Sequence, residues 1–213
     1  MLDYQKEFIE YALECGVLKF GEFQLKSGRL SPYFFNTGLF NTGAKLDKLG
    51  HFYAKALINS ELNPDILYGP AYKGIPLVST AAIAYARLKR DDIPFAFNRK
   101  EAKDHGEGGL LVGSPLQGNV VIIDDVITAG TSVRESVEII NKAKAVPSGV
   151  LIALDRQEKG LNNISATQEV SQRFNMPVVA IICLADIVEF LKTNSETEQQ
   201  LAAIKEYQQS YGI

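Results

Sequence analysis

Two adjacent carboxylates, Asp124 and Asp125, are the residues of this sequence whose type and placement best fit a chemical role. They follow the apolar run 120–123, which is typical of a buried strand. The small residues of the run 128–132 come next, and they can turn successive backbone N–H groups toward one phosphate. The pattern therefore predicts a strand, an anion-binding loop and a helix.

We expect that helix to begin at Ser132, which would form a capping box with Glu135. Its positive dipole end favours a phosphate there. Asp124 and Asp125 would repel the phosphate unless they accept hydrogen bonds from sugar hydroxyls or act through a divalent ion and its waters. A phosphorylated sugar with Mg²⁺ meets both conditions, and an ordinary strand-to-helix turn is the alternative.

Cations and aromatic side chains lie in four other segments. They are Lys26 with Phe34 and Phe35, Tyr72 with Lys73, the group Arg99, Lys100, Lys103 and His105, and Arg156. The planar guanidinium of Arg156 suits a carboxylate ligand. Each segment has an alternative without a ligand. Arg156 would form a salt bridge to Asp155 or Glu158, and Lys26 and Lys73 would be solvated surface lysines. The phenylalanines would belong to the core, and the charged segment from Arg99 to His105 would be disordered.

Short apolar runs alternate with helical stretches along the chain. We expect strands at 66–68, 95–97, 120–123, 150–154 and 178–184, and helices at 46–58, 75–88, 132–143 and 165–174. This alternation predicts an α/β fold with a mostly parallel central sheet flanked by helices. Ligands of such sheets bind beyond the carboxyl ends of the strands, where Asp124 and Arg156 are expected.

The remaining segments predict smaller features within a single domain of residues 1–213. A helix over 3–15 and a strand pair from residue 17 would form a small N-terminal annex, residues 1–40. Residues 99–115 have several glycines and little apolar content, which favours a flexible lid loop. The tail after Thr193 has the spacing of an amphipathic helix.

Composition argues against several classes of protein. A net charge of -3 does not supply the excess of positive charge that binding to nucleic acid requires. No run approaches the roughly 18 apolar residues of a membrane span, and no basic leader precedes an apolar run. We therefore expect a cytoplasmic protein without a nucleic-acid or membrane partner. Cys15 and Cys183 lie in apolar settings and are expected to be buried structural thiols.

The run from Val120 to Ser132 resembles the phosphoribosyl pyrophosphate (PRPP) motif of type I phosphoribosyltransferases. The run from Phe20 to Asn36 looks like the N-terminal signature of the orotate enzymes within that family. The resemblance implies transfer of the phosphoribosyl group of PRPP to orotate, giving orotidine 5′-monophosphate and diphosphate in pyrimidine biosynthesis. Two alternatives stay open, an enzyme for another base and a non-catalytic regulator, and the acidic balance argues against the regulator.

The resemblance also implies roles for individual residues. PRPP would contact Lys26, Tyr72, Lys73, Arg99, Lys100, Lys103, His105, Asp124, Asp125, Val126, Ile127, Thr128, Ala129, Gly130, Thr131 and Ser132. Orotate would contact Phe34, Phe35, Thr128 and Arg156. The catalytic residues would be Lys103, Asp124, Asp125, Lys26 and His105. Mg²⁺ would be held mainly through substrate and water without a dedicated protein cage, and the lid would be shared across the subunits of a homodimer.

Overall fold

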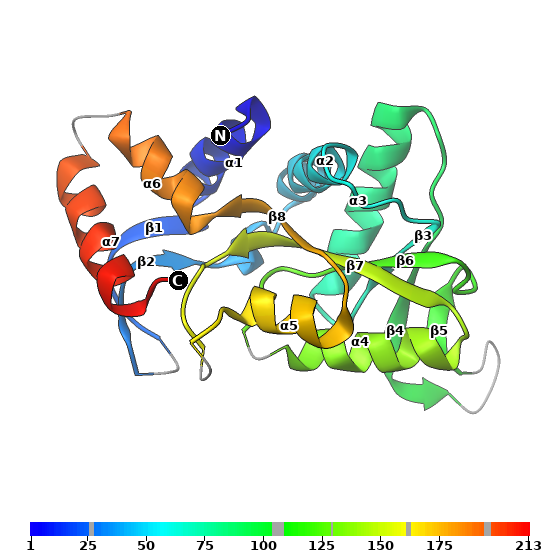
Figure 1. The fold of residues 1–213 in the computed structure, drawn as a ribbon. Coiled ribbons are helices and arrows are strands. Elements are labelled where there is room, and N and C mark those ends of the chain that lie inside the picture. The colour runs from blue at the N-terminus through cyan, green and yellow to red at the C-terminus, as the bar shows by residue number, and fades with distance from the viewer. Residues whose placement is uncertain (26–27, 104–108, 129, 161–162, 194–196) are drawn as a thin grey trace.

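A six-stranded sheet forms the centre of the molecule, with the strand order β5-β4-β3-β6-β7-β8 (Figure 1). The computed structural model describes residues 1–25, 28–103, 109–128, 130–160, 163–193 and 197–213, with only the backbone at 102–103. The strands are β3 (Ile66–Gly69), β4 (Phe95–Lys103), β5 (Gly109–Gly113), β6 (Asn119–Ile123), β7 (Val146–Asp155) and β8 (Val178–Cys183). Only β5 runs antiparallel to its neighbour. The predicted α/β fold with a mostly parallel sheet is confirmed.

Continuous apolar runs form the central strands because helices cover both faces of the sheet. Val120 to Ile123 are fully buried. In the register of the sheet, Ile122 of β6 lies between Tyr68 of β3 and Val150 of β7. The carboxyl ends of these three parallel strands therefore meet at one edge, which we call the carboxyl edge.

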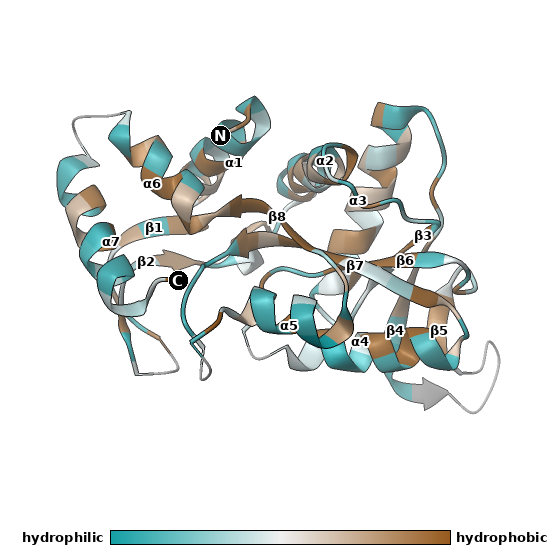
Figure 2. Cartoon of the chain, in the orientation of Figure 1, coloured by the Kyte–Doolittle hydropathy of each residue, from teal (hydrophilic) through white to brown (hydrophobic). Residues whose placement is uncertain are grey.

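The helices divide between the two faces. They are α1 (Asp3–Glu14), α2 (Gly43–Ile58), α3 (Gly74–Lys89), α4 (Thr131–Lys142), α5 (Ala166–Phe174), α6 (Leu184–Lys192) and α7 (Glu198–Tyr211), with the short 3-10 helix η1 (Thr37–Leu39). One core cluster joins α1, α2, α3 and α6 to the sheet, and a second joins α4 and α5 to its other face. Figure 2 shows teal and brown alternating along these helices, as expected of amphipathic elements. No helix in the described part of the chain is long and apolar enough to span a bilayer.

The expected N-terminal helix and strand pair are present. Strand β1 (Leu18–Gln24) pairs antiparallel with β2 (Leu30–Phe35) in a separate two-stranded sheet. Phe8 of α1 lies in the same buried cluster as Val121 of the central sheet, so the annex and the sheet share a core. The expected C-terminal helix is α7, and its Tyr207 ring meets the ring of Tyr33 edge-on at 6.5 Å.

Residues 99–115 differ from the predicted single loop. Strand β4 continues to Lys103, and β5 returns from Gly109 to Gly113, so residues 104–108 connect two strands. Asn98 pairs with Leu111 and Phe97 with Val112. The expected strand 95–97 is the start of β4, whose polar continuation to Lys103 was missed, and β5 was missed because its apolar run, Leu110 to Val112, is only three residues long between two glycines.

The chain also turns into a helix earlier than expected after β8. The apolar run predicted as strand 178–184 ends at Cys183, and Leu184 begins α6. Both elements are apolar, so composition does not mark the boundary between them. Asp186 marks it instead, because its side chain accepts the backbone N–H of Cys183 at 2.7 Å.

Candidate active site at the carboxyl edge

Two buried acids, Asp124 and Asp125, directly follow β6 at the carboxyl edge, and each is 7% exposed. Oδ1 of Asp124 accepts the backbone N–H of Asp125 at 2.9 Å, and Oδ2 accepts the hydroxyl of Ser132 at 2.7 Å. The buried hydroxyl of Tyr53 donates to the carbonyl oxygen of Asp124 at 2.8 Å. The side chain and the backbone of Asp124 are thus both fixed.

Burial raises the pKa of Asp124 to about 6. The bonds from Ser132 and from the backbone of Asp125 oppose this rise, the negative charge of Asp125 adds to it, and the charge of Lys73 lowers it. The desolvation of the carboxylate outweighs the hydrogen bonds that it accepts. The pKa of Asp124 therefore lies closer to neutrality than that of an ordinary carboxyl group.

Asp125 is held from three directions. Its Oδ2 accepts the hydroxyl of Thr37 at 2.9 Å and lies 2.6 Å from Nζ of Lys73, while Oδ1 accepts the backbone N–H of Val126 at 2.9 Å. Each carboxylate oxygen carries two lone pairs, so both acids keep acceptor capacity for a sugar hydroxyl or a bound water.

The predicted capping box of Ser132 and Glu135 is wrong. Helix α4 begins at Thr131, and its N-cap is Gly130, which has a left-handed backbone with φ 65° and makes no side-chain capping bond. Ser132 lies inside the first turn and turns its hydroxyl to Asp124. The first N–H groups of α4 are therefore not capped by a side chain, which suits an incoming anion.

The loop after β3 brings a second set of charges to the same edge. Tyr72 is 68% exposed, and Nζ of Lys100 on β4 lies 5.6 Å from the centre of its ring. Asn98 fixes this loop from β4, because its Oδ1 accepts the backbone N–H of Ala71 at 2.8 Å. Of the predicted PRPP residues on this loop and on β4, Lys73 contacts Asp125, while Tyr72 and Lys100 lie beside each other.

Close backbone packing holds this loop in place. A Cβ atom at Gly69 would collide with the carbonyl oxygen of Gly74 and lie 2.6 Å from Val78. Glycine at position 69 therefore lets β3 and the start of α3 approach each other. The side chain of Lys73 projects from the turn between them.

The two phenylalanines of the predicted base site point in different directions. The ring of Phe34 is 38% exposed and stacks on Phe23 at 5.4 Å between centroids. The ring of Phe35 packs against Phe8 at 6.4 Å. Successive strand residues face opposite sides, so Phe34 offers an open ring and Phe35 belongs mainly to the core of the annex.

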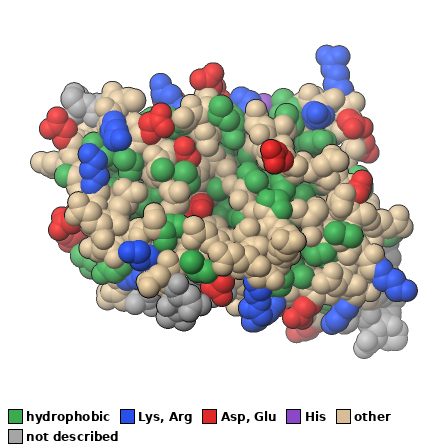
Figure 3. Space-filling view, in the orientation of Figure 1, with side chains coloured by type: hydrophobic (Ala, Val, Ile, Leu, Met, Phe, Trp, Pro, Cys, Tyr) green, Lys and Arg blue, Asp and Glu red, His purple; other side chains and the backbone are tan. Residues whose placement is uncertain are grey.

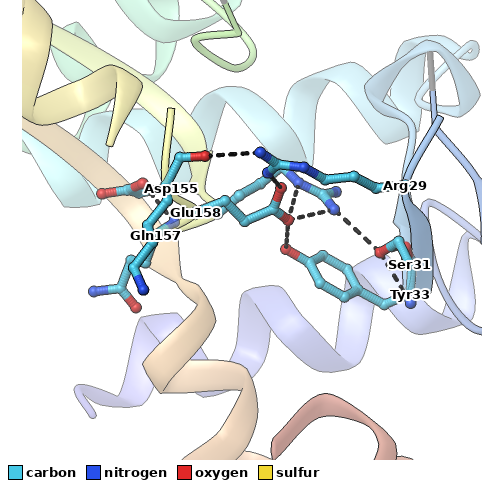
Figure 4. A network of polar contacts seen from close by, with 8 residues as sticks. Arg29, Ser31, Tyr33, Asp155, Gln157 and Glu158 are labelled. Atoms are coloured by element: carbon cyan, nitrogen blue, oxygen red, sulfur yellow. Dashed lines mark hydrogen bonds and ion pairs between the residues drawn. The ribbon is translucent and has the colours of Figure 1, made fainter. Parts of the chain in front are cut away.

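Arg156 follows β7 and lies in a polar network with the annex. Figure 4 shows the neighbouring Ser31, Tyr33 and Glu158. Its Nε donates to Oε1 of Glu158 at 2.7 Å, and its Nη2 donates to the hydroxyl of Ser31 at 3.2 Å. The guanidinium also lies 4.3 Å from the centre of the Tyr33 ring. The alternative salt bridge to Glu158 is therefore present, and the annex strand β2 contacts the same arginine.

The other predicted residues have simpler surroundings. Thr128 and Thr131 are exposed, and Val126 and Ile127 are half-buried. Arg99 donates through Nη1 to the carbonyl oxygen of Gly109 at 3.2 Å across the β4–β5 pair. Lys26, His105, Ala129 and the side chain of Lys103 lie outside the described residues.

Within the described ranges, no three His, Cys, Asp or Glu side chains cluster as metal ligands. The two cysteines are partly exposed, not fully buried as predicted. The Cys183 thiol donates to Asp186 at 3.2 Å, and burial raises its pKa to about 11.

A separate hollow of about 550 Å³ lies between the β1–β2 hairpin and α7. Phe20, Leu30 and Tyr207 are among its lining residues, and neither acid lines it. The space-filling view shows charged side chains of both signs interspersed over the visible face (Figure 3). The acids, and not the volume of this hollow, therefore locate the candidate site.

The sequence interpretation missed Thr37, Asn98 and Glu158. Thr37 lies directly after the run 20–36 that carries the resemblance, and Asn98 directly follows the predicted strand 95–97, so position in the chain was a usable signal for both. The contact from Glu158 to Arg156 was considered only as an alternative to ligand binding.

Comparison with known proteins shows the family of this chain. A phosphoribosyl transferase domain matches residues 39–178. An orotate phosphoribosyltransferase of Shewanella oneidensis is 60% identical over 213 residues, covering 100% of this chain and 99% of that protein. One from Yersinia enterocolitica is 58% identical over 100% of both chains. The crystal structure of the Francisella tularensis orotate phosphoribosyltransferase aligns with a TM-score of 0.89 and 48% identity, over 97% of this chain and 100% of that one.

Proposed function

The chain belongs to the orotate phosphoribosyltransferase family, and we propose that its carboxyl edge is the active site for that family's reaction. The reaction transfers the phosphoribosyl group of PRPP to orotate and gives orotidine 5′-monophosphate and diphosphate, a step of pyrimidine biosynthesis. The observation that carries the placement is the pair of buried acids beside the uncapped start of α4.

PRPP lies across the β6–α4 loop in this proposal. Its 5′-phosphate accepts N–H groups of the segment 128–132, and its ribose hydroxyls face Asp124 and Asp125. The pyrophosphate lies near Tyr72 and Lys73. The remaining cations proposed for this group are Lys26, Arg99, Lys100, Lys103 and His105.

Orotate lies between the Phe34–Phe35 segment and Thr128, with its carboxylate on Arg156. The contact of Arg156 with Ser31 supports this placement because it brings β2 to the carboxyl edge, and Phe34 on the same strand has an exposed ring. A guanidinium that is already oriented by Glu158 loses little freedom when it binds a carboxylate.

Mg²⁺ is proposed as the cofactor, held mainly through the pyrophosphate and water. Bound there, it would neutralise charge on the leaving diphosphate. The acids fit this arrangement because their oxygens are already bonded to Ser132, Thr37 and Lys73, and their remaining lone pairs suit hydroxyls and waters.

Transfer breaks the bond between C1 of the ribose and the diphosphate oxygen and forms a bond from C1 to the ring nitrogen of orotate, whose N–H proton passes to the departing diphosphate or to water. Negative charge grows on the diphosphate while positive charge develops on the sugar. Lys73 and the other cations stabilise the leaving group, and Asp124 and Asp125 lie on the sugar side. Lys73 must exchange Asp125 for the diphosphate when PRPP binds.

Segment 99–115 is proposed to close over the site of the neighbouring subunit in a homodimer, with Lys103 as its catalytic cation. Mixing a Lys103→Ala protein with an Asp125→Ala protein tests this sharing. Hybrid dimers would then contain one intact site and regain activity that neither parent has. Mixtures no more active than their parents, with hybrids shown by mass, would contradict a shared lid. We also propose a cytoplasmic location.

Competition among bases tests the substrate assignment. The purified protein with PRPP and Mg²⁺ is offered orotate, uracil, adenine and hypoxanthine in equal amounts, and the nucleotide products are separated. We expect orotidine 5′-monophosphate as the dominant product. A dominant product formed from another base would contradict orotate as the substrate.

A further inference from the structure

A threonine far from the acids in sequence donates to one of them. The hydroxyl of Thr37 lies 2.9 Å from Oδ2 of Asp125, across 88 positions of sequence, and Thr37 is 9% exposed. The same oxygen accepts Nζ of Lys73 at 2.6 Å. Asp125 thus has one donor from the annex and one from the loop after β3.

The two donors differ in how firmly they are held. Thr37 begins η1, whose N-cap Asn36 accepts the backbone N–H of Gly38 at 3.0 Å. The same short segment ends at Phe40, whose ring stacks 6.3 Å from Phe8 in the buried core. The side chain of Lys73 is 64% exposed. Thr37 is therefore a fixed donor, and Lys73 is one that can move.

Binding of a diphosphate would draw the ammonium of Lys73 away from Asp125, since the diphosphate carries more charge than one carboxylate. The Thr37 hydroxyl would then be the remaining side-chain donor to Asp125 within the described part of the chain. A buried carboxylate that loses its donors is free to rotate away from its ligand.

We propose that Thr37 is a positioning residue that keeps Asp125 oriented toward the ribose while Lys73 binds the diphosphate. The inference rests on the ribose role of Asp125 proposed above. Thr37 follows Phe35 by two residues, so one short segment serves the base side of the site and also holds the acid on its sugar side.

Three substitutions separate this role from a purely structural one. Thr37→Val keeps the shape and removes the hydroxyl, Thr37→Ser keeps the hydroxyl, and Thr42→Val removes a hydroxyl that only caps α2 by accepting the N–H of Lys45 at 3.3 Å. A hydrogen bond to a charged group is worth about 10-fold to 100-fold in an equilibrium constant. We expect Thr37→Val to lower kcat/KM for PRPP by that factor, mainly through KM.

Thr37→Ser should restore most of the wild-type kcat/KM. Thr42→Val should lower resistance to urea and leave the kinetics unchanged. If Thr37→Val does not fold, Thr37→Ala replaces it as the hydroxyl-free variant. Wild-type kinetics in a folded hydroxyl-free variant, or no recovery with serine, would overturn the inference.

A binding cycle tests whether Thr37 acts through Asp125. Calorimetry gives the affinity for PRPP with Mg²⁺ in the wild type, Thr37→Val, Asp125→Ala and the double variant. We expect Thr37→Val to have no further effect once Asp125 is alanine, and additive losses would contradict the proposal. A wild type that does not turn over orotate would instead contradict the proposed function, so the two failures are distinguishable.

Discussion

Nζ of Lys73 lies 2.6 Å from Oδ2 of Asp125, and this ion pair joins the loop after β3 to the loop after β6. The two strands are hydrogen-bonded neighbours in the sheet, so the pair spans one strand spacing. Without ligand, the ammonium and the carboxylate neutralise each other. A ligand that offers a diphosphate to Lys73 and hydroxyls to Asp125 would satisfy both groups separately.

Lys73→Met should weaken PRPP binding far more than it weakens the fold. The Lys73 side chain is 64% exposed and Asp125 keeps its bonds from Thr37 and Val126, so the pair contributes about 1 kcal/mol to stability. A lysine on a diphosphate in a closed site contributes about 10-fold to 100-fold to kcat/KM. Steady-state kinetics and urea unfolding measure the two effects. Arg87→Met is the matched control, because Arg87 pairs with Asp47 at 2.9 Å on an exposed surface. An unchanged KM for PRPP in Lys73→Met would contradict a contact between Lys73 and PRPP.

Asp124→Asn should change how stability depends on pH. The pKa of Asp124 is raised from 3.8 to about 6 by burial, so the folded state binds its proton more tightly than the unfolded state does. The resulting stabilisation is complete below about pH 4 and is lost as pH rises through 6, an effect of about 3 kcal/mol. Asparagine has no such proton.

The stability of the wild type relative to Asp124→Asn should therefore fall between pH 4 and 7. Urea unfolding of both proteins at constant ionic strength measures the difference, and the exposed Asp47→Asn serves as control. A difference that does not vary with pH would show that Asp124 is not desolvated as the structure indicates.

Arg156→Lys should raise the KM for orotate by about 10-fold to 100-fold and leave the KM for PRPP nearly unchanged. A lysine cannot reproduce both the bond from Nε to Glu158 and the planar contact with Tyr33. Arg29→Lys is the control, because Arg29 lies 3.9 Å from the same glutamate. Equal effects on both substrates would indicate a general loss of structure instead of a lost orotate contact.

Gly69→Ala should destabilise the loop that carries Lys73. The added methyl group would meet the carbonyl oxygen of Gly74 and the side chain of Val78. Overpacking of this kind costs about 1 to 3 kcal/mol. Thermal unfolding measures the loss, and Gly43→Ala, where nothing lies within 4 Å of the added Cβ, is the matched control. Equal melting temperatures for the two variants would contradict the close approach of β3 and α3.

The sequence predicts those parts of the fold and site that depend on local pattern. The buried run 120–123 followed by Asp124 and Asp125 gives both a strand and its functional end, because the side chains of a doubly covered strand are all apolar until it leaves the sheet. Strand β5 was missed because its apolar residues, Leu110 to Val112, are a run of only three between two glycines, and pairing with β4 completes the strand.

The unpredicted parts of the site are contacts made by tertiary packing. Ser132 fits a capping pattern, yet Gly130 supplies the turn and the serine hydroxyl goes to the nearby acid. Thr37 reaches Asp125 only because the annex packs against α2 and the sheet through a common core. Position in the chain places Thr37 next to the annex motif, but it does not show that the hydroxyl of Thr37 reaches Asp125.

Consumption of orotate tests the central claim most directly. The purified protein is mixed with orotate, PRPP and Mg²⁺, and orotate is followed by its ultraviolet absorbance, with parallel reactions lacking the metal or using Asp125→Ala. The account predicts rapid loss of orotate that requires Mg²⁺ and is strongly reduced in the variant. A folded wild-type protein that leaves orotate unchanged, or an Asp125→Ala variant as active as the wild type, would contradict it.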